Sequence, residues 1–292
     1  MPELPEVECV RLSLERLVVG RRVRAVRVSR ADVVNGPTGE EALLAGEKVS
    51  KIIRHGKQLA IVGSRRCVAV HLGMSGQLCL VEARPPSTQA VKRLGRPNSS
   101  LADTDLPPHT HVVWALEGGI RLRFTDPRRF GGLWTFGSED DLVFERWSKL
   151  GPDALTIKPG QLARRLSRTT RGLKAALLDQ HLIAGLGNIY VDELLFSARL
   201  HPLLPANALG SKQTPGLVRR MRALLTGAIK RGGSSLRDYV DAENQRGSQQ
   251  TRHRVYGRSG QRCKRRACHG RVSSEQVAGR TTAWCPECQK LA

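Results

Sequence analysis

The chain begins MPELPEVE, with a proline at the second position and two carboxylates close behind it. Removal of Met1 would leave Pro2 as a secondary amine at the chain terminus, and an α-amino group titrates near pH ~8, so part of it is neutral at physiological pH. Such an amine can attack an electrophilic carbon and form an iminium, as in Schiff-base enzymes. Glu3 is one residue away and could move the protons. A capped helix start explains Pro5 and Glu6 equally well, but it gives Pro2 no role.

A second set of reactive side chains is found near the end of the chain. Two cysteines separated by four residues are followed, sixteen residues later, by two separated by two residues: Cys263, Cys268, Cys285 and Cys288. Two such cysteine pairs, each called a zinc knuckle, are typical of a closed structural zinc site. Four thiolate ligands leave no open position on the metal for catalysis. The first knuckle is two residues longer than usual, so His269 as a substitute ligand and free thiols remain alternatives. The metal would hold a hairpin at residues 272–284, which carries Arg280 towards a partner.

Three glycine-flanked turns carry side chains suited to nucleic acid. HLGMSGQL presents Met74, and TDPRRFGG presents Arg128, Arg129 and Phe130. Exposed apolar side chains beside arginines suit a wedge inserted between stacked bases, although each could instead be an ordinary core residue at a strand end. In AGLGNIYVDE, Asn188 follows two glycines at an expected helix start, where exposed amides would bind phosphate. A plain tight turn between helices is the alternative there.

The composition favours a polyanionic partner. The 48 Lys and Arg exceed the 26 Asp and Glu, which gives a net charge of +22. Such an excess indicates nucleic acid more often than an anionic membrane, with a merely solvated surface as the remaining alternative. No apolar run approaches the ~18 residues of a membrane span, and the acidic N-terminus is unlike a signal peptide. We therefore expect a cytoplasmic protein that associates with DNA and has no membrane contact. The sequence shows no sign of an obligate protein partner, so we expect a monomer.

Hydrophobic periodicity divides the chain into two halves of different character. Apolar residues at positions 7, 10, 14 and 17 predict a helix over residues 5–17, and the following segments alternate as in a β-sandwich or barrel. A long loop is expected over residues 83–109. Seven strands are expected, at residues 21–30, 49–55, 58–62, 67–74, 77–82, 111–116 and 119–125. Helices are expected in the second half, at residues 145–155, 161–169, 173–179, 188–200 and 217–231.

Taken together, these motifs resemble the formamidopyrimidine-DNA glycosylase family of base-excision repair. The resemblance runs through PELPEVE, HGKQLA, HLGMSGQL, TDPRRFGG, LKAALLDQHLIAGLGNIYVDELLF, GGSSLRDYV, VYGRSG and GRTTAWCPECQK, in that order. The sister branch, endonuclease VIII, typically opens with PEGPE, so PELPE favours the branch that acts on purine lesions. The resemblance implies an α+β multidomain fold: an N-terminal catalytic β-sandwich with flanking helices (1–140), a helix–two-turn–helix domain (141–250) and a C-terminal zinc finger (251–292).

The resemblance also implies roles for individual residues. Pro2 would be the nucleophile, Glu3 the general acid and base, and Lys57 an essential lysine on a phosphate beside the lesion. Base flipping is expected, because C1′ cannot be reached inside a stacked duplex. Met74, Arg128 and Phe130 would fill the space of the flipped base, Arg128 also reading the orphaned cytosine. Asn188 and Arg280 would clamp phosphates, Lys174 would lie near the site, and residues 238–254 resemble a lesion-capping loop.

The function implied is that of a bifunctional DNA glycosylase and AP lyase with one structural Zn²⁺. It would excise 8-oxoguanine and formamidopyrimidines from damaged double-stranded DNA and then cut the strand by elimination. One alternative is an endonuclease VIII-like glycosylase for oxidised pyrimidines. Another is a non-catalytic DNA-binding protein on the same scaffold, against which the intact Pro2, Glu3 and Lys57 argue.

Overall fold

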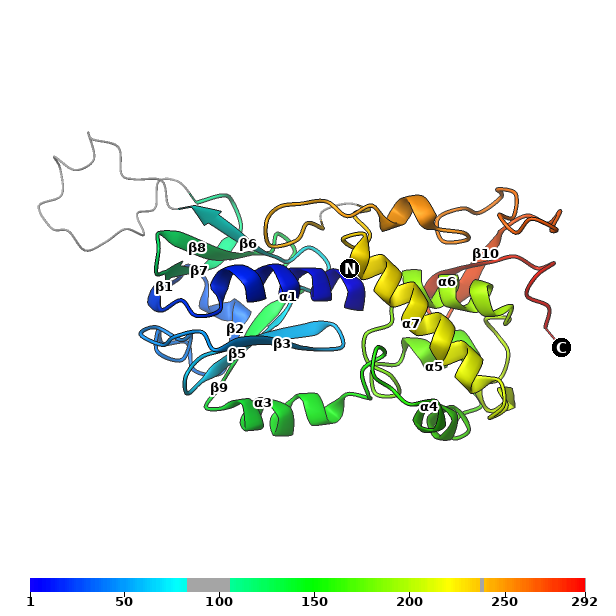
Figure 1. Ribbon diagram of the computed structural model, residues 1–292, viewed down its shortest axis with the longest axis horizontal. Coiled ribbons are helices and arrows are strands. Elements are labelled where there is room, and N and C mark those ends of the chain that lie inside the picture. Colours follow the sequence, from blue (N-terminus) through cyan, green and yellow to red (C-terminus); the bar gives the residue numbers. More distant parts are fainter. Residues whose placement is uncertain (83–105, 237–238, 292) are drawn as a thin grey trace, which may run out of the picture.

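The computed structural model describes residues 1–82, 106–236 and 239–291. Figure 1 shows an elongated molecule, with two β-sheets at one end and a group of helices at the other. Most of the loop expected at 83–109 lies outside the described residues. Residues 237 and 238, where the expected capping loop begins, also lie outside them. Within the described ranges, no helix is both long and apolar enough to cross a membrane.

Two sheets form the β-rich end of the molecule, as the sequence predicts. A cluster of buried apolar side chains lies between them, with contributions from Ile61 and Val70 in one sheet and Trp114 and Phe124 in the other. One sheet has the order β1 (Val23–Val28), β7 (Thr110–Leu116), β8 (Ile120–Thr125) and β6 (Gln77–Glu82). The other has the order β2 (Val34–Asn35), β9 (Gly132–Phe136), β5 (Cys67–His71), β4 (Gln58–Val62) and β3 (Lys51–His55). β2 and β9 were not predicted.

The first helix, α1 (Leu4–Val18), connects the chain terminus to this sandwich. Its predicted apolar face is buried in the sandwich core through Val7, Val10 and Leu14. A capping box closes its start: the amide of Glu3 donates to Glu6, three residues on. The first residues of the chain are therefore fixed by a helix that is itself packed on a sheet.

The helical end of the molecule differs from prediction at its first helix. Instead of a helix over 145–155, the chain forms α3 (Glu139–Glu145) and a short 3₁₀ turn at Trp147–Lys149. The hydroxyl of Ser138 caps α3 by accepting from the amide of Asp141 at 3.1 Å, a signal that the apolar periodicity did not show. The remaining helices agree in position with the expected ones: α4 (Pro159–Leu166), α5 (Leu173–Leu178), α6 (Asn188–Ala198) and α7 (Thr214–Lys230).

The last part of the chain joins both ends of the molecule. The hairpin predicted at 272–284 is present as β10 (Ser273–Val277) and β11 (Arg280–Trp284). Upstream of it, Ala242 returns to the sandwich core, and its carbonyl accepts from the amide of Leu80 at 2.8 Å. The segment between α7 and the hairpin therefore spans the boundary between the two ends of the molecule.

Candidate active site and nucleic-acid interface

Glu3 is held at the N-terminal end of α6, where backbone amides converge on its carboxylate. Oε1 accepts from the amide of Ile189 at 2.8 Å, and Oε2 accepts from that of Tyr190 at 3.3 Å. Gly187 permits this approach, because a Cβ atom there would lie 2.3 Å from Cδ of Glu3. Burial raises the pKa of Glu3, while the charge of Lys57 and the α6 amides act in the opposite direction. The result is a fixed carboxylate that can take up or release a proton.

Glu6, one turn further along α1, is the centre of a buried hydrogen-bond network. Its Oε1 accepts from the hydroxyl of Tyr190 at 2.6 Å and from the amide of Ser234 at 2.8 Å. Burial, reinforced by the nearby charge of Glu3, raises the pKa of Glu6 to about 7. The hydroxyl of Ser234 lies 3.2 Å from Nε2 of His253, which extends the network towards the C-terminal part of the chain.

Pro2 lies on the wall of a cavity of about 350 Å³ between the two ends of the molecule. That volume falls within the usual range for pockets that hold small organic groups. Side chains from both ends bound it, among them Glu6, Met74, Arg128, Ile189 and Ser234. The predicted nucleophile therefore faces a space that a flipped nucleotide could occupy.

Lys57 stands on the turn of the β3–β4 hairpin and is buried, with 8% of its surface exposed. Burial lowers the pKa of Lys57, while the negative charge of Glu3 raises it and the positive charge of Arg280 lowers it further. These opposing effects show that Lys57 is close enough to both groups to feel their charges. The structure thus gathers three predicted residues that are far apart in the sequence.

An ion pair braces the turn that carries Lys57. The guanidinium of Arg54 pairs with Asp153 and with Glu8, and all three side chains are largely buried. The amide of Gly56 donates to the same Asp153 carboxylate at 2.8 Å. Gly56 has a φ of +58°, and a Cβ atom there would lie 2.8 Å from that of Ala184. The turn is therefore fastened to the helical end of the molecule.

The two loops with the predicted wedge residues are fastened to each other by Asp126. This side chain is completely buried. Its Oδ1 accepts from the hydroxyl of Ser75 at 2.6 Å and its Oδ2 from the amide of Gly131 at 2.7 Å. Its carbonyl lies 2.9 Å from Nε2 of the buried His111. One carboxylate therefore fixes the backbone on both sides of the loop after β8 and joins it to the loop after β5.

The wedge side chains themselves point outward. Met74 is 42% exposed and Phe130 56% exposed, and the guanidinium of Arg128 lies 4.8 Å from the centre of the Phe130 ring. Arg129 is also exposed, but it turns away to Asp32, whose carboxylate is 3.1 Å distant. The structure brings Met74, Arg128 and Phe130 together and separates Arg129 from them, so its contact with DNA stays a prediction.

A second predicted group meets where α5, α6 and the hairpin touch. The side-chain amide of Asn188 donates to the carbonyl of Thr281 at 2.8 Å, and the ammonium of Lys174 donates to the same carbonyl at 3.2 Å. Thr281 is the neighbour of the exposed Arg280. Lys174 has no exposed surface and pairs with Asp192 at 2.6 Å. Lys174 therefore supports the hairpin from inside, and its direct contact with DNA stays a prediction.

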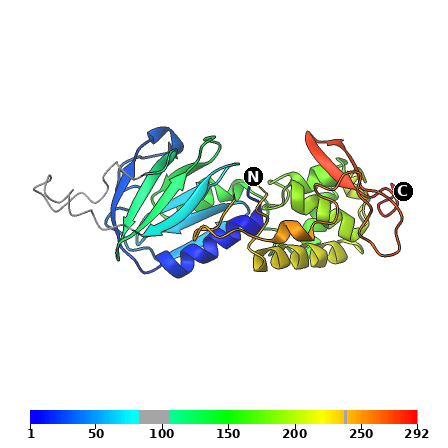
Figure 2. The same ribbon diagram turned by 90° about the horizontal axis from the view of Figure 1, so that it is seen from above.

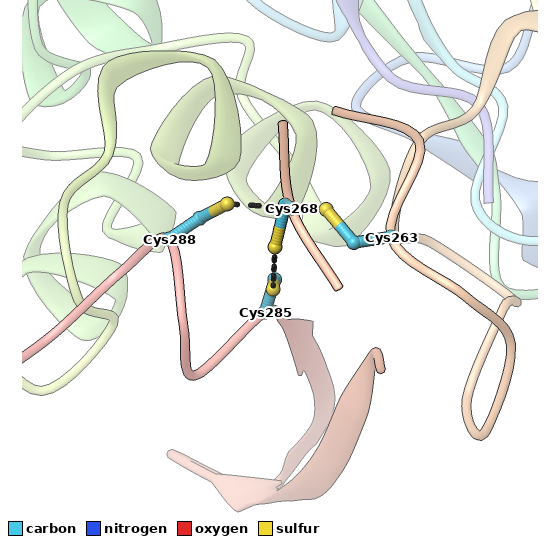
Figure 3. Close-up of side chains that lie close together, drawn as sticks. All are labelled: Cys263, Cys268, Cys285 and Cys288. Atoms are coloured by element: carbon cyan, nitrogen blue, oxygen red, sulfur yellow. Dashed lines mark hydrogen bonds between the residues drawn. The ribbon is translucent and has the colours of Figure 1, made fainter. Parts of the chain in front are cut away.

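The four cysteines of the tail converge on one point, as Figure 3 shows. Their sulfur atoms all lie within 4.8 Å of one another, with 3.9 Å between Cys263 and Cys288 and 3.7 Å between Cys268 and Cys285. A tetrahedron of thiolates about 2.3 Å from a zinc ion has edges of about 3.8 Å, so the set fits structural Zn²⁺.

The long first knuckle does not bring its histidine into the zinc site. His269 is exposed and its Nδ1 lies 3.3 Å from Nη2 of Arg262, so the mixed Cys/His alternative is not supported among the described residues. Arg265, in the middle of the knuckle, donates to the carbonyl of Phe196 at 2.8 Å and lies over its ring. The longer knuckle thus docks on the last turn of α6.

Sequence reasoning missed the residues that support the site. Tyr190 and Ser234 hold Glu6, Asp153 holds the Lys57 turn, and Asp126 holds the wedge loops. Each is an ordinary residue type at an unremarkable position, so its partners across the chain could not be read from spacing. One signal was available for the two aspartates, because each is an isolated acid in an otherwise basic chain.

Comparison with known proteins matches most of the chain to the family that the sequence motifs resemble. Residues 1–133 match the family profile described as the formamidopyrimidine-DNA glycosylase N-terminal domain, and residues 150–240 match the H2TH domain of the same family. A Geobacillus kaustophilus formamidopyrimidine-DNA glycosylase is 38% identical, over 99% of this chain and 100% of its own.

Two solved structures extend the likeness to three dimensions. The Thermus thermophilus MutM (Fpg) protein is similar with a TM-score of 0.81 and 37% identity, with 100% of both chains covered. A Lactococcus lactis Fpg variant, solved with DNA containing Fapy-dG, has a TM-score of 0.83 and 32% identity. That likeness covers 99% of this chain and 100% of the other.

Proposed function

The chain belongs to the formamidopyrimidine-DNA glycosylase family, whose members are DNA glycosylases with AP lyase activity, and from that premise we propose how its own residues perform the reaction. With Met1 removed, the amine of Pro2 attacks C1′ of the damaged nucleotide. The new C–N bond replaces the glycosidic bond, and the departing base takes a proton. The C1′–O4′ bond then opens, O4′ takes a proton and the amine loses its own, so that an iminium links protein and sugar. Loss of a C2′ proton then expels the 3′ phosphate and cuts the strand.

Glu3 moves the protons in this scheme. Its carboxylate is one residue from the amine and is fixed by the amides at the start of α6, so its position does not depend on the substrate. Burial raises its pKa, which makes the protonated form accessible nearer neutral pH. This fixed carboxylate beside the cavity at Pro2 is the observation on which the proposal chiefly rests.

The remaining predicted residues would hold the DNA. Lys57 and Arg280, which feel each other's charge, would bind backbone phosphates beside the lesion, together with Asn188. Met74, Arg128 and Phe130 would enter the space left by the flipped base. The damaged duplex would lie across the cavity. The similar Lactococcus lactis Fpg variant was solved as a complex with DNA that contains Fapy-dG.

The finer assignments follow the same reasoning. The substrates would be 8-oxoguanine and formamidopyrimidines, and the enzyme would act in the bacterial cytoplasm. The four cysteines would hold one Zn²⁺, whose thiolate bonds fix the hairpin with Arg280 and take no part in the chemistry. Residues 1–140, 141–250 and 251–292 would be the three domains.

Borohydride trapping tests the nucleophile. Reduction during turnover of an 8-oxoguanine:cytosine duplex should yield a protein–DNA adduct, which mass spectrometry of the digested adduct places on Pro2. A matched protein that keeps an extra residue before Pro2 should bind the duplex and give no adduct. An adduct from that blocked protein would disprove the N-terminal mechanism. Preferential cutting of a thymine-glycol duplex in direct competition would instead favour the oxidised-pyrimidine alternative.

A further inference from the structure

The helical end of the molecule contains two long segments without a single acidic residue. Residues 154–178 and 199–236 contain no Asp or Glu, yet they contain six and seven Lys or Arg respectively. The first segment includes α4 and α5, and the second includes all of α7. The basic excess of the chain is therefore concentrated on particular helices.

The outward face of α7 carries cations that are not paired with carboxylates in the described part of the chain. Arg219 and Lys230 are exposed on one side of the helix, about 16 Å apart along its axis, and Arg220 is exposed beside them. Between the first two, the same side presents Ala223 and Thr226. Within the part of the chain that the structure describes, none of these three cations forms an ion pair with a carboxylate.

The charged residues of α1 show how cations are balanced on a helix of this protein that also carries acids. There Arg11 pairs with Glu8 three residues before it and with Glu15 four residues after it, both at 2.8 Å. Such pairs neutralise a surface helix locally. Nothing comparable is possible on α7, since its sequence offers no acid.

This face of α7 is turned away from the proposed catalytic cleft. In Figure 2, α1 (blue) and α7 (yellow) run along one long side of the molecule, whereas the β10–β11 hairpin (red) and the N-terminus lie towards the other. Figure 1 agrees, with α7 in the foreground and β10 behind it. A duplex held beside Pro2 and Arg280 would therefore leave the outward face of α7 uncovered.

We propose that Arg219, Arg220 and Lys230 bind the phosphate backbone of a second DNA duplex while the first occupies the cleft. Duplex DNA has about one phosphate per 1.7 Å of axis, so a 16 Å row of cations meets several of them. The small side chains of Ala223 and Thr226 let the backbone come close, and no carboxylate repels it. An enzyme with two such surfaces can pass from one DNA segment to the next without first dissociating.

The same face is poorly suited to an anionic membrane. A helix that lies in a membrane interface inserts a row of apolar side chains below its cations. The apolar residues of α7, among them Leu217, Met221 and Leu225, are buried against the other helices. Because α7 exposes cations without a row of apolar side chains, its outward face suits a phosphate backbone better than a membrane interface.

A bridging assay tests this inference separately from catalysis. A donor-labelled short duplex with a stable abasic-site analogue is bound first to fill the cleft, and an acceptor-labelled undamaged duplex is then added at increasing salt. The wild-type protein should bring the two labels together. R219Q/R220Q/K230Q should weaken second-duplex binding on the order of tenfold or more in 50 mM salt. It should also reduce the log–log salt slope by about 2.7, since each phosphate contact contributes about 0.9.

The matched control is R16Q/R24Q/K51Q, which removes the same charge from exposed cations that have acidic partners. It should bridge almost as well as the wild type, and both variants should cleave a short lesion duplex at the wild-type rate. Equal loss of bridging in the two variants, or no bridging by the wild type, would overturn the inference. So would binding of phosphatidylserine vesicles, rather than the acceptor duplex, through the α7 residues. Failure of cleavage by the wild type would count against the proposed function alone.

Discussion

The start of α1 contributes Glu6 to the cavity beside Pro2, and the loops after β5 and β8 contribute Met74 and Arg128, but the side chains of the two regions are held differently. Glu3 and Glu6 are 3% and 2% exposed, and four hydrogen bonds from α6 and the Ser234 region hold them. Met74 and Phe130 are 42% and 56% exposed. In the loops it is the backbone that is fixed, by the buried Asp126, while the side chains remain free to meet a partner.

This difference suits the two tasks that we propose for these residues. A group that moves protons needs a shifted pKa and a constant position, and both come from burial among hydrogen-bond donors. A group that replaces a flipped base must be exposed before DNA arrives, because it has to enter the stack. We therefore expect changes in the buried group to alter chemistry, and changes in the loops to alter which duplex is chosen.

The largest effect is expected at the buried carboxylate. Glu3→Gln keeps the shape and most hydrogen bonds but cannot carry the proton, so single-turnover excision should slow by about 10²- to 10⁴-fold. Glu15→Gln, on the exposed side of the same helix, should leave the rate unchanged. Quenched-flow kinetics on an 8-oxoguanine duplex measure both. Similar rates for the two variants would show that Glu3 does not act in proton transfer.

The next effect concerns the hairpin beside the four cysteines, which contacts α6 as Glu3 does. Cys285→Ala should lose the single zinc and, because Arg280 is no longer fixed, lower DNA affinity about tenfold or more. Metal analysis and fluorescence anisotropy measure these changes. Cys67→Ala, at a buried thiol in the sheet, is the control and should keep the metal. Full zinc retention in Cys268→Ala would contradict the four-cysteine site and implicate His269.

A smaller and more selective effect is expected from the loops. Arg128→Ala should reduce the preference for 8-oxoguanine opposite cytosine over adenine by about five- to a hundredfold, since a base contact of this kind is worth roughly 1–3 kcal/mol. Lys57→Ala should instead lower activity on both duplexes alike, because a phosphate contact reads no base. Parallel single-turnover assays on the two duplexes decide between these outcomes. An unchanged ratio in Arg128→Ala would refute the reading role.

The last effect is on stability rather than on activity, and it changes with pH. Because the pKa of Glu6 is raised from 4.5 to about 7, the folded chain holds a proton that the unfolded chain releases between these values. The free energy of unfolding therefore loses this contribution as pH rises through that window, by at most about 3 kcal/mol. Glu6→Gln has no titratable group at this position, so only the wild type should lose this stability as pH rises. The difference between the thermal midpoint of the variant and that of the wild type should therefore increase from pH 4.5 to pH 8. A constant difference would argue against the shift.

Local sequence patterns predicted much of the fold. The apolar spacing of α1, the alternation of seven strands and the periodicity of α7 each arise from neighbouring residues, which is why they could be read without a structure. The helix expected over 145–155 was wrong, because the Ser138 cap starts α3 earlier. β2 and β9 were missed, since they are short and pair with strands distant in sequence.

The sequence alone determined the chemistry that this protein carries: an N-terminal proline followed by a carboxylate, four spaced cysteines and a large basic excess. Residue types and short spacings are local properties, so they needed no fold. Only the tertiary structure decided which groups act together. Glu3 depends on amides 186 and 187 residues away, and Lys174 turned out to be a buried support for Thr281. Burial and pKa arise from such distant neighbours, and no local pattern specifies them.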